Sequence, residues 1–596
     1  GLLKVDFLGL RNLTVIAKAV QMVEENHGTK IDIDKINLEE AKVYQLFADG
    51  LTVGIFQFES KGMREYLLQL KPSCLQDLIA MNALYRPGPM GNIPEFIARK
   101  HGVSKTEYIH PDLEPILKET YGIIVYQEQV MQISSIIAGF TLVQADEMRR
   151  AMGKKKADLM AAFRKDFIRG AIENKMNEEE ATLIYDHLEK FAQYGFNKSH
   201  STAYAIIAYQ TAWLKTFYPA EFIAANLTTE MENLDRVVTL IEEADNMGVK
   251  VYPPDVNSSF SDFRSTSEKE ILFGLSAIKN VGHKVSECIA ETREHSGKFH
   301  SIFDLCKDLD PHVLNRKALE SLICAGACDS LKGTRAQNFA SVESALQFGA
   351  RFNQNKETQQ VDIFSSAGVE TIYEPDLVDA ELWTNEECQL KEKETLGFYL
   401  SGHPLEKYKE ELAEFSTLSL EDYDLSKLPN VIRFGGIISD VKPKMNKKNQ
   451  QWAIIELSGI NGKIELFVFN DIFETNKKLI LPNELVFIEG TPYRQNGDEN
   501  STRISVKTIV KLSQVRKKLS HNINIRLPFN LKNVDDIDHI KTICGDNQGW
   551  CKLIFHTERS DKSVEKIVSR SMRVSPSVKF LNQLRAVVGK QNVWIT

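Results

Sequence analysis

The sequence predicts a multidomain protein of mixed α and α+β class, mostly helical at first, then with a small β-barrel and a small α+β domain. Three observations predict it. Residues 13–260 carry apolar side chains at three- and four-residue spacing, which is typical of helices. Residues 430–513 alternate apolar and polar side chains, which is typical of strands. Residues 520–596 follow the order strand, helix, strand, strand, helix, strand.

Length and composition limit the possible classes of protein. At 596 residues the chain is expected to hold several domains. Its apolar and charged contents are those of a globular protein, and no apolar run approaches the roughly 18 residues of a membrane span. We therefore expect no contact with a membrane. The net charge of −8 means that any nucleic-acid binding must use local basic patches.

The first residues and the cysteines give two further expectations. The chain begins with Gly1, and GLLKVDFLGL lacks the features of a signal peptide, so we expect a fragment of a longer protein. Eight scattered cysteines without a CxxC pair favour reduced thiols and a cytoplasmic location.

Residues 1–12 are predicted to form a strand with Asp6 in its middle. A carboxylate within an apolar strand is costly unless it binds a metal or finds a partner. The alternative is an edge strand whose aspartate points to water.

Between Arg149 and Arg169 the chain has eight basic and two acidic residues. Arg150 and Lys154 are four residues apart and would share a helix face. Arginine forks beside a lysine suit the oxygens of a polyphosphate. The alternative is a solvated helix face.

A second group of donors, Asn197, Lys198 and His200, lies in FNKSH, just before a long apolar-periodic run. A donor-rich turn at a helix start suits an anion. Arg86 lies beside the breaker-rich loop RPGPM, where a loop salt bridge is the alternative. Tyr204, Tyr209 and Trp213 in the apolar run are expected in the core.

Residues 261–345 contain the turn IKNVG between two short helical patterns, which resembles a helix-hairpin-helix. Gly282 would let backbone amides approach a DNA phosphate, and Lys279 would add charge. The alternative is a plain helix–helix turn with a C-cap glycine. Residues 346–385 are predicted to be polar and irregular, with QVDIF inside them.

The alternating region 430–513 contains WAIIELSGINGKIELFVF, two strands joined at Asn461-Gly462. Short strands with such turns predict an OB-fold. The loop between the first strands is basic and contains Lys442, Lys444, Lys447 and Lys448. It would hold single-stranded nucleic acid, or it would be merely solvated. Trp452 is interpreted as a core residue. Residues 520–596 predict an α+β unit of ferredoxin-like order.

Four strings, RPGPM, YGIIVYQEQVMQI, RRAMGKKK and YGFNKSHSTAYA, closely resemble the fingers of the C-family bacterial replicative DNA polymerase III alpha subunits. The resemblance implies template-directed DNA synthesis from dNTPs on primed DNA, by nucleotidyl transfer with two Mg²⁺ ions. It makes Asp6 in KVDFLGLR one of three metal-binding catalytic aspartates, with Lys4 beside it. No equivalent of the other two is found, so this chain alone is expected to be inactive.

The same resemblance assigns domains and partners. It implies the end of the palm at 1–12, fingers at 13–260, a helix-hairpin-helix and clamp-binding region at 261–425, the OB-fold at 430–513 and a C-terminal domain at 520–596 that contacts the clamp-loader tau subunit. Nucleotide-binding residues would be Arg86, Arg149, Arg150, Lys154, Asn197, Lys198 and His200. The peptide that binds the sliding clamp (beta) would comprise Gln360, Val361, Asp362, Ile363 and Phe364.

Two other classes of protein remain open. One is a non-enzymatic nucleic-acid-binding scaffold of helix-hairpin-helix and OB modules, which the basic patches alone would favour. The other is a helical assembly protein whose basic runs are solubility faces.

Overall fold

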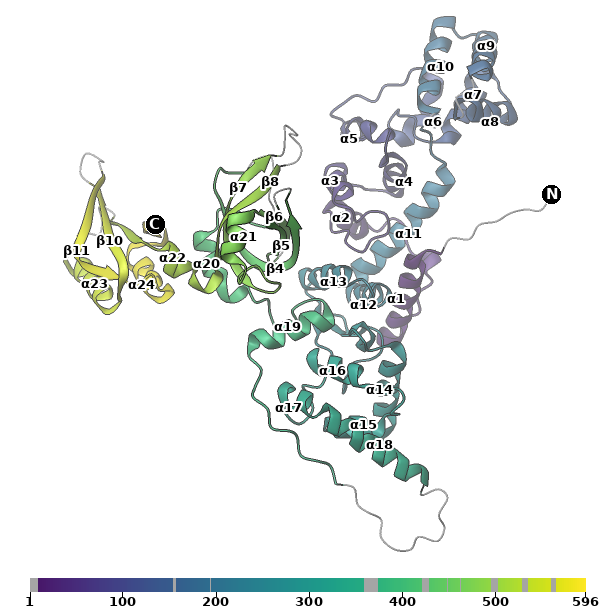
Figure 1. Cartoon of the computed structure of the whole chain (residues 1–596). Coiled ribbons are helices and arrows are strands. Elements are labelled where there is room, and N and C mark those ends of the chain that lie inside the picture. Colours follow the sequence, from purple (N-terminus) through teal and green to yellow (C-terminus); the bar gives the residue numbers. More distant parts are fainter. Residues whose placement is uncertain are drawn as a thin grey trace. The chain divides into compact units, whose positions relative to one another are not determined.

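The computed structural model describes residues 9–153, 157–192, 194–358, 373–420, 428–446, 449–460, 462–494, 502–527, 534–558 and 564–596. The chain divides into two compact units, Gly1–Trp383 with Lys391–Phe398, and Thr384–Leu390 with Tyr399–Thr596. Helices dominate the first unit, and the second contains a closed barrel and a small α+β domain (Figure 1). The predicted mixed α and α+β class is confirmed.

Helices occupy most of residues 11–246. They are α1 (Arg11–His27), α2 (Ala41–Ala48), α3 (Lys61–Leu70), α4 (Leu75–Leu84), α5 (Ile93–Lys100), α6 (Glu114–Leu117), α7 (Gln127–Ala138), α8 (Leu142–Gly153), α9 (Ala157–Glu173), α10 (Glu178–Ala192), α11 (Lys198–Phe217), α12 (Pro219–Thr229) and α13 (Leu234–Asn246). Short 3-10 turns η1 (Ile33–Lys35), η2 (Pro89–Asn92), η3 (Pro111–Leu113) and η4 (Lys118–Thr120) lie between them.

Local sequence signals set several helix ends. Ser60 and Asn233 begin α3 and α13, because each side chain accepts a hydrogen bond from the backbone N–H three residues on. Gly28 and Gly139 end α1 and α7 in the left-handed conformation that glycine adopts without strain.

Helices α7 to α10 share one hydrophobic core, in which Phe167 and Tyr185 are fully buried. Helix α9 crosses α7 closely at Gly170, where an added Cβ would lie 2.1 Å from the carbonyl oxygen of Ala138. This shared core positions α7 and α8, which carry parts of the candidate site.

The rest of the first unit begins with a small sheet of β1 (Lys250–Tyr252), β2 (Arg264–Ser267) and β3 (Glu270–Leu272), in the order β1-β3-β2. It continues with η5 (Leu275–Ala277), α14 (His283–Ser296), α15 (Ile302–Asp308), α16 (Arg316–Cys324), α17 (Arg335–Ala340) and α18 (Val342–Thr358). The prediction of helical patterns on both sides of the turn at 278–282 was therefore half wrong. The first pattern is β3 and one 3-10 turn, and the second is α14.

The prediction that residues 346–385 are irregular was also wrong for 346–358, which continue α18. Two residues of this otherwise polar segment, Phe348 and Gly349, explain the helix. Phe348 packs edge-on against Phe303 of α15, with ring centroids 5.8 Å apart. Gly349 lets the two helices approach, because an added Cβ would lie 2.2 Å from the carbonyl oxygen of Cys306. The chain then forms α19 (Asn385–Leu396), η6 (Glu406–Tyr408) and α20 (Lys409–Phe415).

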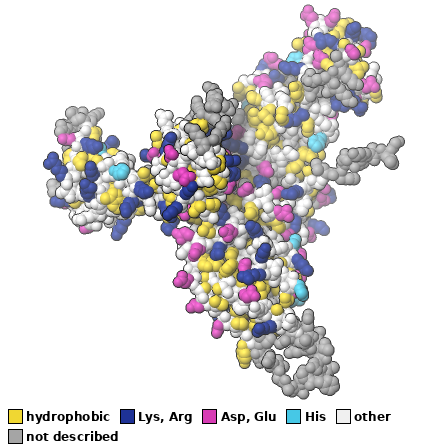
Figure 2. All heavy atoms as spheres, in the orientation of Figure 1, with side chains coloured by type: hydrophobic (Ala, Val, Ile, Leu, Met, Phe, Trp, Pro, Cys, Tyr) yellow, Lys and Arg dark blue, Asp and Glu magenta, His cyan; other side chains and the backbone are white. Residues whose placement is uncertain are grey.

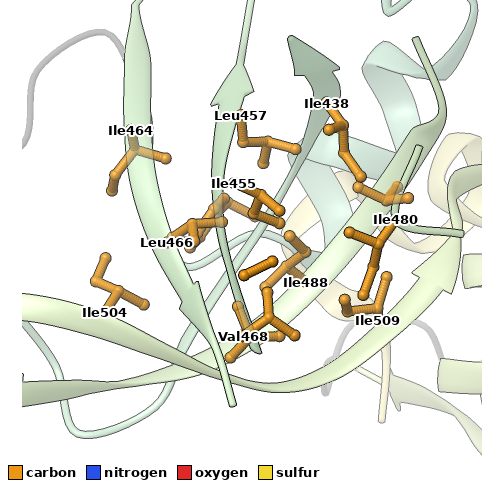
Figure 3. Packing of buried hydrophobic residues seen from close by; sticks show 14 of the residues in the cluster. Ile438, Ile455, Leu457, Ile464, Leu466, Val468, Ile480, Ile488, Ile504 and Ile509 are labelled. Carbon is orange, nitrogen blue, oxygen red and sulfur yellow. The ribbon is translucent and has the colours of Figure 1, made fainter. Parts of the chain in front are cut away.

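The barrel consists of β4 (Ile432–Met445), β5 (Gln451–Ser458), β6 (Lys463–Val468), β7 (Leu485–Arg494) and β8 (Thr502–Lys511), with α21 (Asn470–Asn476) between β6 and β7. It closes in the order β4-β5-β6-β8-β7, with β6 parallel to β8. Ser458 pairs with Lys463, which confirms the predicted β5–β6 hairpin. Alternate residues point inward, including Ile455 and Leu457 of β5 and Leu466 of β6 (Figure 3). The five-stranded barrel agrees with the predicted OB-fold.

The C-terminal domain follows η8 (Leu512–Gln514) and α22 (Val515–Leu519). It comprises β9 (Asn522–Leu527), α23 (Val534–Asp546), β10 (Gln548–Glu558), β11 (Val564–Val574), α24 (Val578–Val588), η9 (Lys590–Asn592) and β12 (Val593–Ile595). The order of elements is as predicted, but the ferredoxin-like arrangement was wrong. The sheet order is β11-β10-β9-β12, so β9 and β10 pair directly in parallel instead of being split by another strand. The order of elements along the chain does not determine which strand of the β10–β11 hairpin pairs with β9.

A buried ion pair anchors helix α11 to its neighbours. The Lys215 side chain is fully buried, and its Nζ donates to the carbonyl oxygens of Leu51 and Val53 at 2.8 Å and to Glu243 Oε1 at 2.5 Å. Burial lowers the pKa of Lys215 from its ordinary value, and Glu243 opposes that effect. Within the part of the chain that the structure describes, no helix is both long and apolar enough to cross a membrane.

We predict that Lys215→Met destabilises the first unit by about 3–5 kcal/mol, because it leaves the Glu243 carboxylate buried and unpaired. Hydrogen exchange of the α11 and α13 backbone amides measures this effect. The double change Lys215→Met with Glu243→Leu should recover most of the lost protection. Equal exchange in the wild type and the single variant would contradict the assignment.

Candidate nucleotide and nucleic-acid sites

Several predicted site residues lie outside the described residues. They are the proposed metal ligand Asp6 and its neighbour Lys4, Lys154 of the basic run, the clamp-binding residues Gln360, Val361, Asp362, Ile363 and Phe364, and Lys447 and Lys448 of the barrel loop. Their roles stay predictions. The other predicted residues fall into three places: the fingers, the helix-hairpin-helix turn and the barrel surface.

The site in the fingers is built on a backbone bridge between Tyr126 and Phe196. The N–H of Gln127 donates to the carbonyl oxygen of Phe196 at 2.9 Å, and the N–H of Phe196 donates to that of Val125 at 3.3 Å. Seventy residues apart in sequence, the start of α7 and the segment before α11 therefore lie side by side. Tyr126 is buried, which anchors this bridge in the core.

Arg149 reaches this bridge from α8. Its Nη1 donates to Gln127 Oε1 at 3.1 Å, and Gln127 Nε2 donates to the carbonyl oxygen of Gly195 at 2.9 Å. Arg149 also donates twice to Asp146 Oδ1, at 3.0 and 2.7 Å, and Arg150 Nε contacts Asp146 Oδ2 at 2.8 Å. The hydrogen bond from Arg149 holds the pKa of the Asp146 carboxyl below its ordinary value. The Arg150 side chain is 65% exposed.

The donors of FNKSH lie on the other side of the bridge. Asn197 is the N-cap of α11, and its Oδ1 accepts a hydrogen bond from the N–H of His200 at 2.8 Å. Glu128 of α7 accepts from Asn197 Nδ2 at 2.8 Å and from the N–H of Lys198 at 2.9 Å. Lys198 Nζ donates to both carboxylate oxygens of Glu119, at 2.7 and 2.8 Å.

Aromatic rings and Arg86 complete the cluster. The His200 ring lies 4.3 Å from the Tyr204 ring and 5.4 Å from the Phe196 ring. The Arg86 guanidinium stacks over Phe196 at 4.5 Å and donates to the backbone carbonyls of Ala83 and Tyr194. Burial lowers the pKa of Arg86 from its ordinary value. The alternative role of Arg86 in a loop salt bridge finds no support among the described contacts.

The structure thus brings together one group of predicted nucleotide-binding residues around the Tyr126–Phe196 bridge: Arg86, Arg149, Asn197, Lys198 and His200. Arg150 lies on the same turn of α8. Sequence reasoning missed their acidic partners, Glu119, Glu128 and Asp146. The four-residue spacing of Asp146 and Arg150 could have identified one of these pairs, whereas no spacing rule links Glu119 with Lys198.

The acidic partners determine what the cluster can do. Carboxylate oxygens and phosphate oxygens are the same kind of acceptor for guanidinium and ammonium donors. The cations are therefore already held in positions that suit oxyanions. Lys198 and Glu119 are both about one-third exposed, so an incoming phosphate has access to this pair.

Gln129, the third residue of α7, is polar but does not face solvent. This side chain is buried, accepts hydrogen bonds from the N–H groups of Val125 and Tyr126, and donates to Thr120 Oγ1 and the carbonyl oxygen of Ile116. Gln129 is thus a structural residue that holds the bridge strand in place. Tyr209 is buried as predicted, while Tyr204 and Trp213 are partly exposed.

The helix-hairpin-helix turn leads into α14 through Gly282, its N-cap. Gly282 has an ordinary φ of −72°, and an added Cβ would meet nothing within 4 Å. Neither backbone strain nor packing therefore requires glycine here, and glycine is among the residues favoured at an N-cap. The neighbouring N–H of Lys279 donates to the carbonyl oxygen of Thr395 at 2.9 Å. A cavity of about 370 Å³ beside this turn is lined by Lys279, Lys317 and Lys391 among others.

The barrel carries an aromatic cluster on its outer surface. Trp452 stacks on Phe467 and Phe469, with centroids 6.0 and 5.9 Å apart, so its interpretation as a core residue was wrong. Lys444 pairs directly with Trp452 across β4 and β5. Arg503 lies 4.9 Å above the Phe467 ring. Lys442 is paired with Asp440 at 3.3 Å.

The described residues combine a helical unit, in which a cluster of cations is paired with carboxylates, with a helix-hairpin-helix turn and a closed five-stranded barrel. A family model described as the bacterial DNA polymerase III alpha subunit finger domain matches residues 12–175, and a helix-hairpin-helix motif matches residues 248–338.

Curated relatives make the assignment more specific. The chain is 37% identical over its full length to the DNA polymerase III subunit alpha of Pseudomonas aeruginosa, 37% to that of Borreliella burgdorferi and 36% to that of Escherichia coli K12. It spans about half the length of these relatives, 53%, 52% and 52% respectively. Over its whole length the chain thus resembles about half of the bacterial DNA polymerase III alpha subunits.

We predict that Glu128→Ala loosens the start of α11, because the N–H of Lys198 and the Asn197 amide lose a charged acceptor. The free energy of opening at the Lys198 amide should fall by about 1–2 kcal/mol, so hydrogen exchange there should speed up by about 5- to 30-fold. Glu147→Ala, which removes an exposed carboxylate from α8, is the matched control. Unchanged exchange in Glu128→Ala would show that the cap is dispensable.

Proposed function

We propose that this chain is the part of a replicative DNA polymerase that supplies nucleotide, DNA and sliding-clamp contacts. In the complete enzyme it would serve template-directed 5′–3′ DNA synthesis from dNTPs on a primed template. The observation that carries the proposal is the convergence of predicted nucleotide-binding residues on the Tyr126–Phe196 bridge in a chain that resembles the DNA polymerase III alpha subunits. The triphosphate would displace Glu119 from Lys198 and engage the guanidinium of Arg149.

The metal chemistry of the complete enzyme would use residues outside the described part of this chain. Two Mg²⁺ ions would activate the primer 3′-hydroxyl and hold the triphosphate, with Asp6 as one ligand and Lys4 beside it. Among the described residues, no group of three or more His, Cys, Asp and Glu side chains could hold a metal ion. The described part of the chain would position the nucleotide and the DNA.

DNA would contact two further places. The amides near Gly282 and the ammonium of Lys279 would hold a duplex phosphate without reading sequence. Trp452 and Lys444 of the barrel would hold single-stranded DNA, the ring by stacking and the lysine by charge. The C-terminal domain would meet the clamp-loader tau subunit, and residues 360–364 the sliding clamp. A bacterial replication enzyme of this kind would work in the cytoplasm.

Lys198→Gln tests the nucleotide site in the complete enzyme. Removal of one charge-assisted contact to phosphate should cost about 1.5–3 kcal/mol, so kcat/KM for the incoming dNTP should fall by roughly ten- to hundredfold. Single-nucleotide incorporation on a primed template at varied dNTP concentration measures this. Lys165→Gln, an exposed lysine on α9 that makes no described ion pair, is the control.

Normal incorporation by Lys198→Gln would remove Lys198 from the site. No incorporation by the unaltered complete protein would instead favour the alternative, a non-enzymatic nucleic-acid-binding scaffold.

The clamp proposal has its own test. Phe364→Ala with Ile363→Ala should leave short-gap filling by the complete enzyme almost unchanged, while clamp-dependent long synthesis collapses. The reason is that a tether to the ring raises the effective concentration of the polymerase on DNA to the order of millimolar. Equal loss in both assays would mean that the segment is structural.

A further inference from the structure

The C-terminal sheet has one face covered by helices and one face open. Its covered face packs Ile523 and Ile525 of β9 and Leu553 of β10 against α23 and α24. Because side chains alternate along a strand, the residues between these point to the open face. The strand pairing places them in three rows that run across the sheet.

The two outer rows are basic. His556 of β10 pairs with Arg526 on one side and with Lys566 on the other. Lys552 pairs with Arg573 of β11. Four residues of β10 separate these two rows, which corresponds to about 13–14 Å along a strand.

The middle row is apolar and aromatic. Trp594 of β12 pairs with Asn524, which pairs with Ile554, which pairs with Val568. Val568 is 47% exposed and Trp594 is partly exposed, whereas Asn524 and Ile554 between them are buried, so the row is open to solvent at its two ends. The Trp594 ring lies 4.9 Å from the His556 ring.

A chain of side-chain hydrogen bonds holds one end of the middle row. His556 Nε2 donates to Asn524 Oδ1 at 2.9 Å, because an amide oxygen can only accept. Asn524 Nδ2 in turn donates to Thr596 Oγ1 at 3.0 Å. Asn524 is buried, so this chain of hydrogen bonds fixes the His556 and Trp594 side of the row.

The cations of the outer rows lack acidic partners among the described side chains. Arg526, Lys552 and Lys566 are exposed, and no described carboxylate lies within 4 Å of their charged groups. Burial, and then Lys566 and Arg526, lower the pKa of His556, so both cations act on its ring. On the side of the C-terminal domain that Figure 2 displays, Lys and Arg side chains outnumber Asp and Glu. Clustered unpaired cations attract a polyanion.

We propose that this open face is a binding platform for single-stranded nucleic acid. The strand would run along the middle row, with bases against Trp594 and Val568 at its two ends and phosphates against either basic row. Exposed rings beside unpaired cations are what sequence-neutral single-strand binding needs. A duplex would keep its bases stacked inside and could use the basic rows alone. This inference does not depend on the nucleotide site or on polymerase activity.

The test uses the full chain and a fluorescein-labelled oligothymidylate of 20 nucleotides, with anisotropy measured over a range of salt concentrations. R526Q/K566Q removes two phosphate contacts. The slope of log K against log salt should then fall by about 1.4, since each single-strand contact contributes about 0.7. If the variant and the wild type bind equally at 1 M salt, this change of slope makes the variant bind about 25-fold more weakly than the wild type at 0.1 M salt.

The matched control is K541Q/K579Q, which makes the same change of charge on α23 and α24. It should leave both the Kd and the slope unchanged. Because the barrel is itself a proposed single-strand site, the comparison is repeated in a W452A background, where R526Q/K566Q should cause the same drop in slope. Far-UV circular dichroism verifies that each variant is folded.

The proposal is overturned if R526Q/K566Q behaves like its control, or if its effect disappears in the W452A background. It is also overturned if R526Q/K566Q keeps its affinity for the oligonucleotide but loses binding to purified clamp-loader tau subunit, because the open face would then be a protein interface.

Discussion

The backbone bridge between Tyr126 and Phe196 is the constraint on which the site in the fingers depends. Its two hydrogen bonds join the start of α7 to the segment before α11. The buried amide of Gln129 holds one strand of the bridge, and Glu128 caps the helix that follows the other. Five of the six predicted nucleotide-binding residues that the structure describes lie on or beside this bridge, and the sixth, Arg150, follows Arg149 on α8, although the residues come from three separate stretches of sequence.

The ion pairs around the bridge balance the positive charge of its cations. Asp146 satisfies the arginines of α8, and Glu119 satisfies Lys198. Exposed pairs of this kind contribute little stability, about 0–1 kcal/mol each, so a phosphate can replace the carboxylate at small cost. Lys215 and Glu243 form a different kind of pair, since burial makes each indispensable to the other. The exposed pairs suit exchange of a carboxylate for a ligand, and the buried pair stabilises the fold.

Periodicity and turn chemistry were enough to predict the fold class, the β5–β6 hairpin and the order of elements in the C-terminal domain. They failed where contacts between residues distant in sequence determine the secondary structure or the strand pairing. Residues 346–358 are helical because Gly349 allows α18 to pack on α15, and β9 pairs with β10 because the hairpin adds on that edge. In the site, the basic residues were visible in the sequence, while the carboxylate partners of Lys198 and Asn197 come from over 60 residues away. Trp452 was misjudged because alternation does not tell the inside of a barrel from the outside.

The central claim is that the cations around the bridge exchange carboxylates for the phosphates of a nucleotide. Amine acetylation of Lys198 tests it most directly, in the complete enzyme on a primed template whose primer ends in a dideoxynucleotide. Addition of the matching dNTP should protect Lys198 strongly, while a mismatched dNTP should not, and the exposed Lys165 of α9 should react equally in all samples. Equal acetylation of Lys198 with and without the matching dNTP would contradict the account.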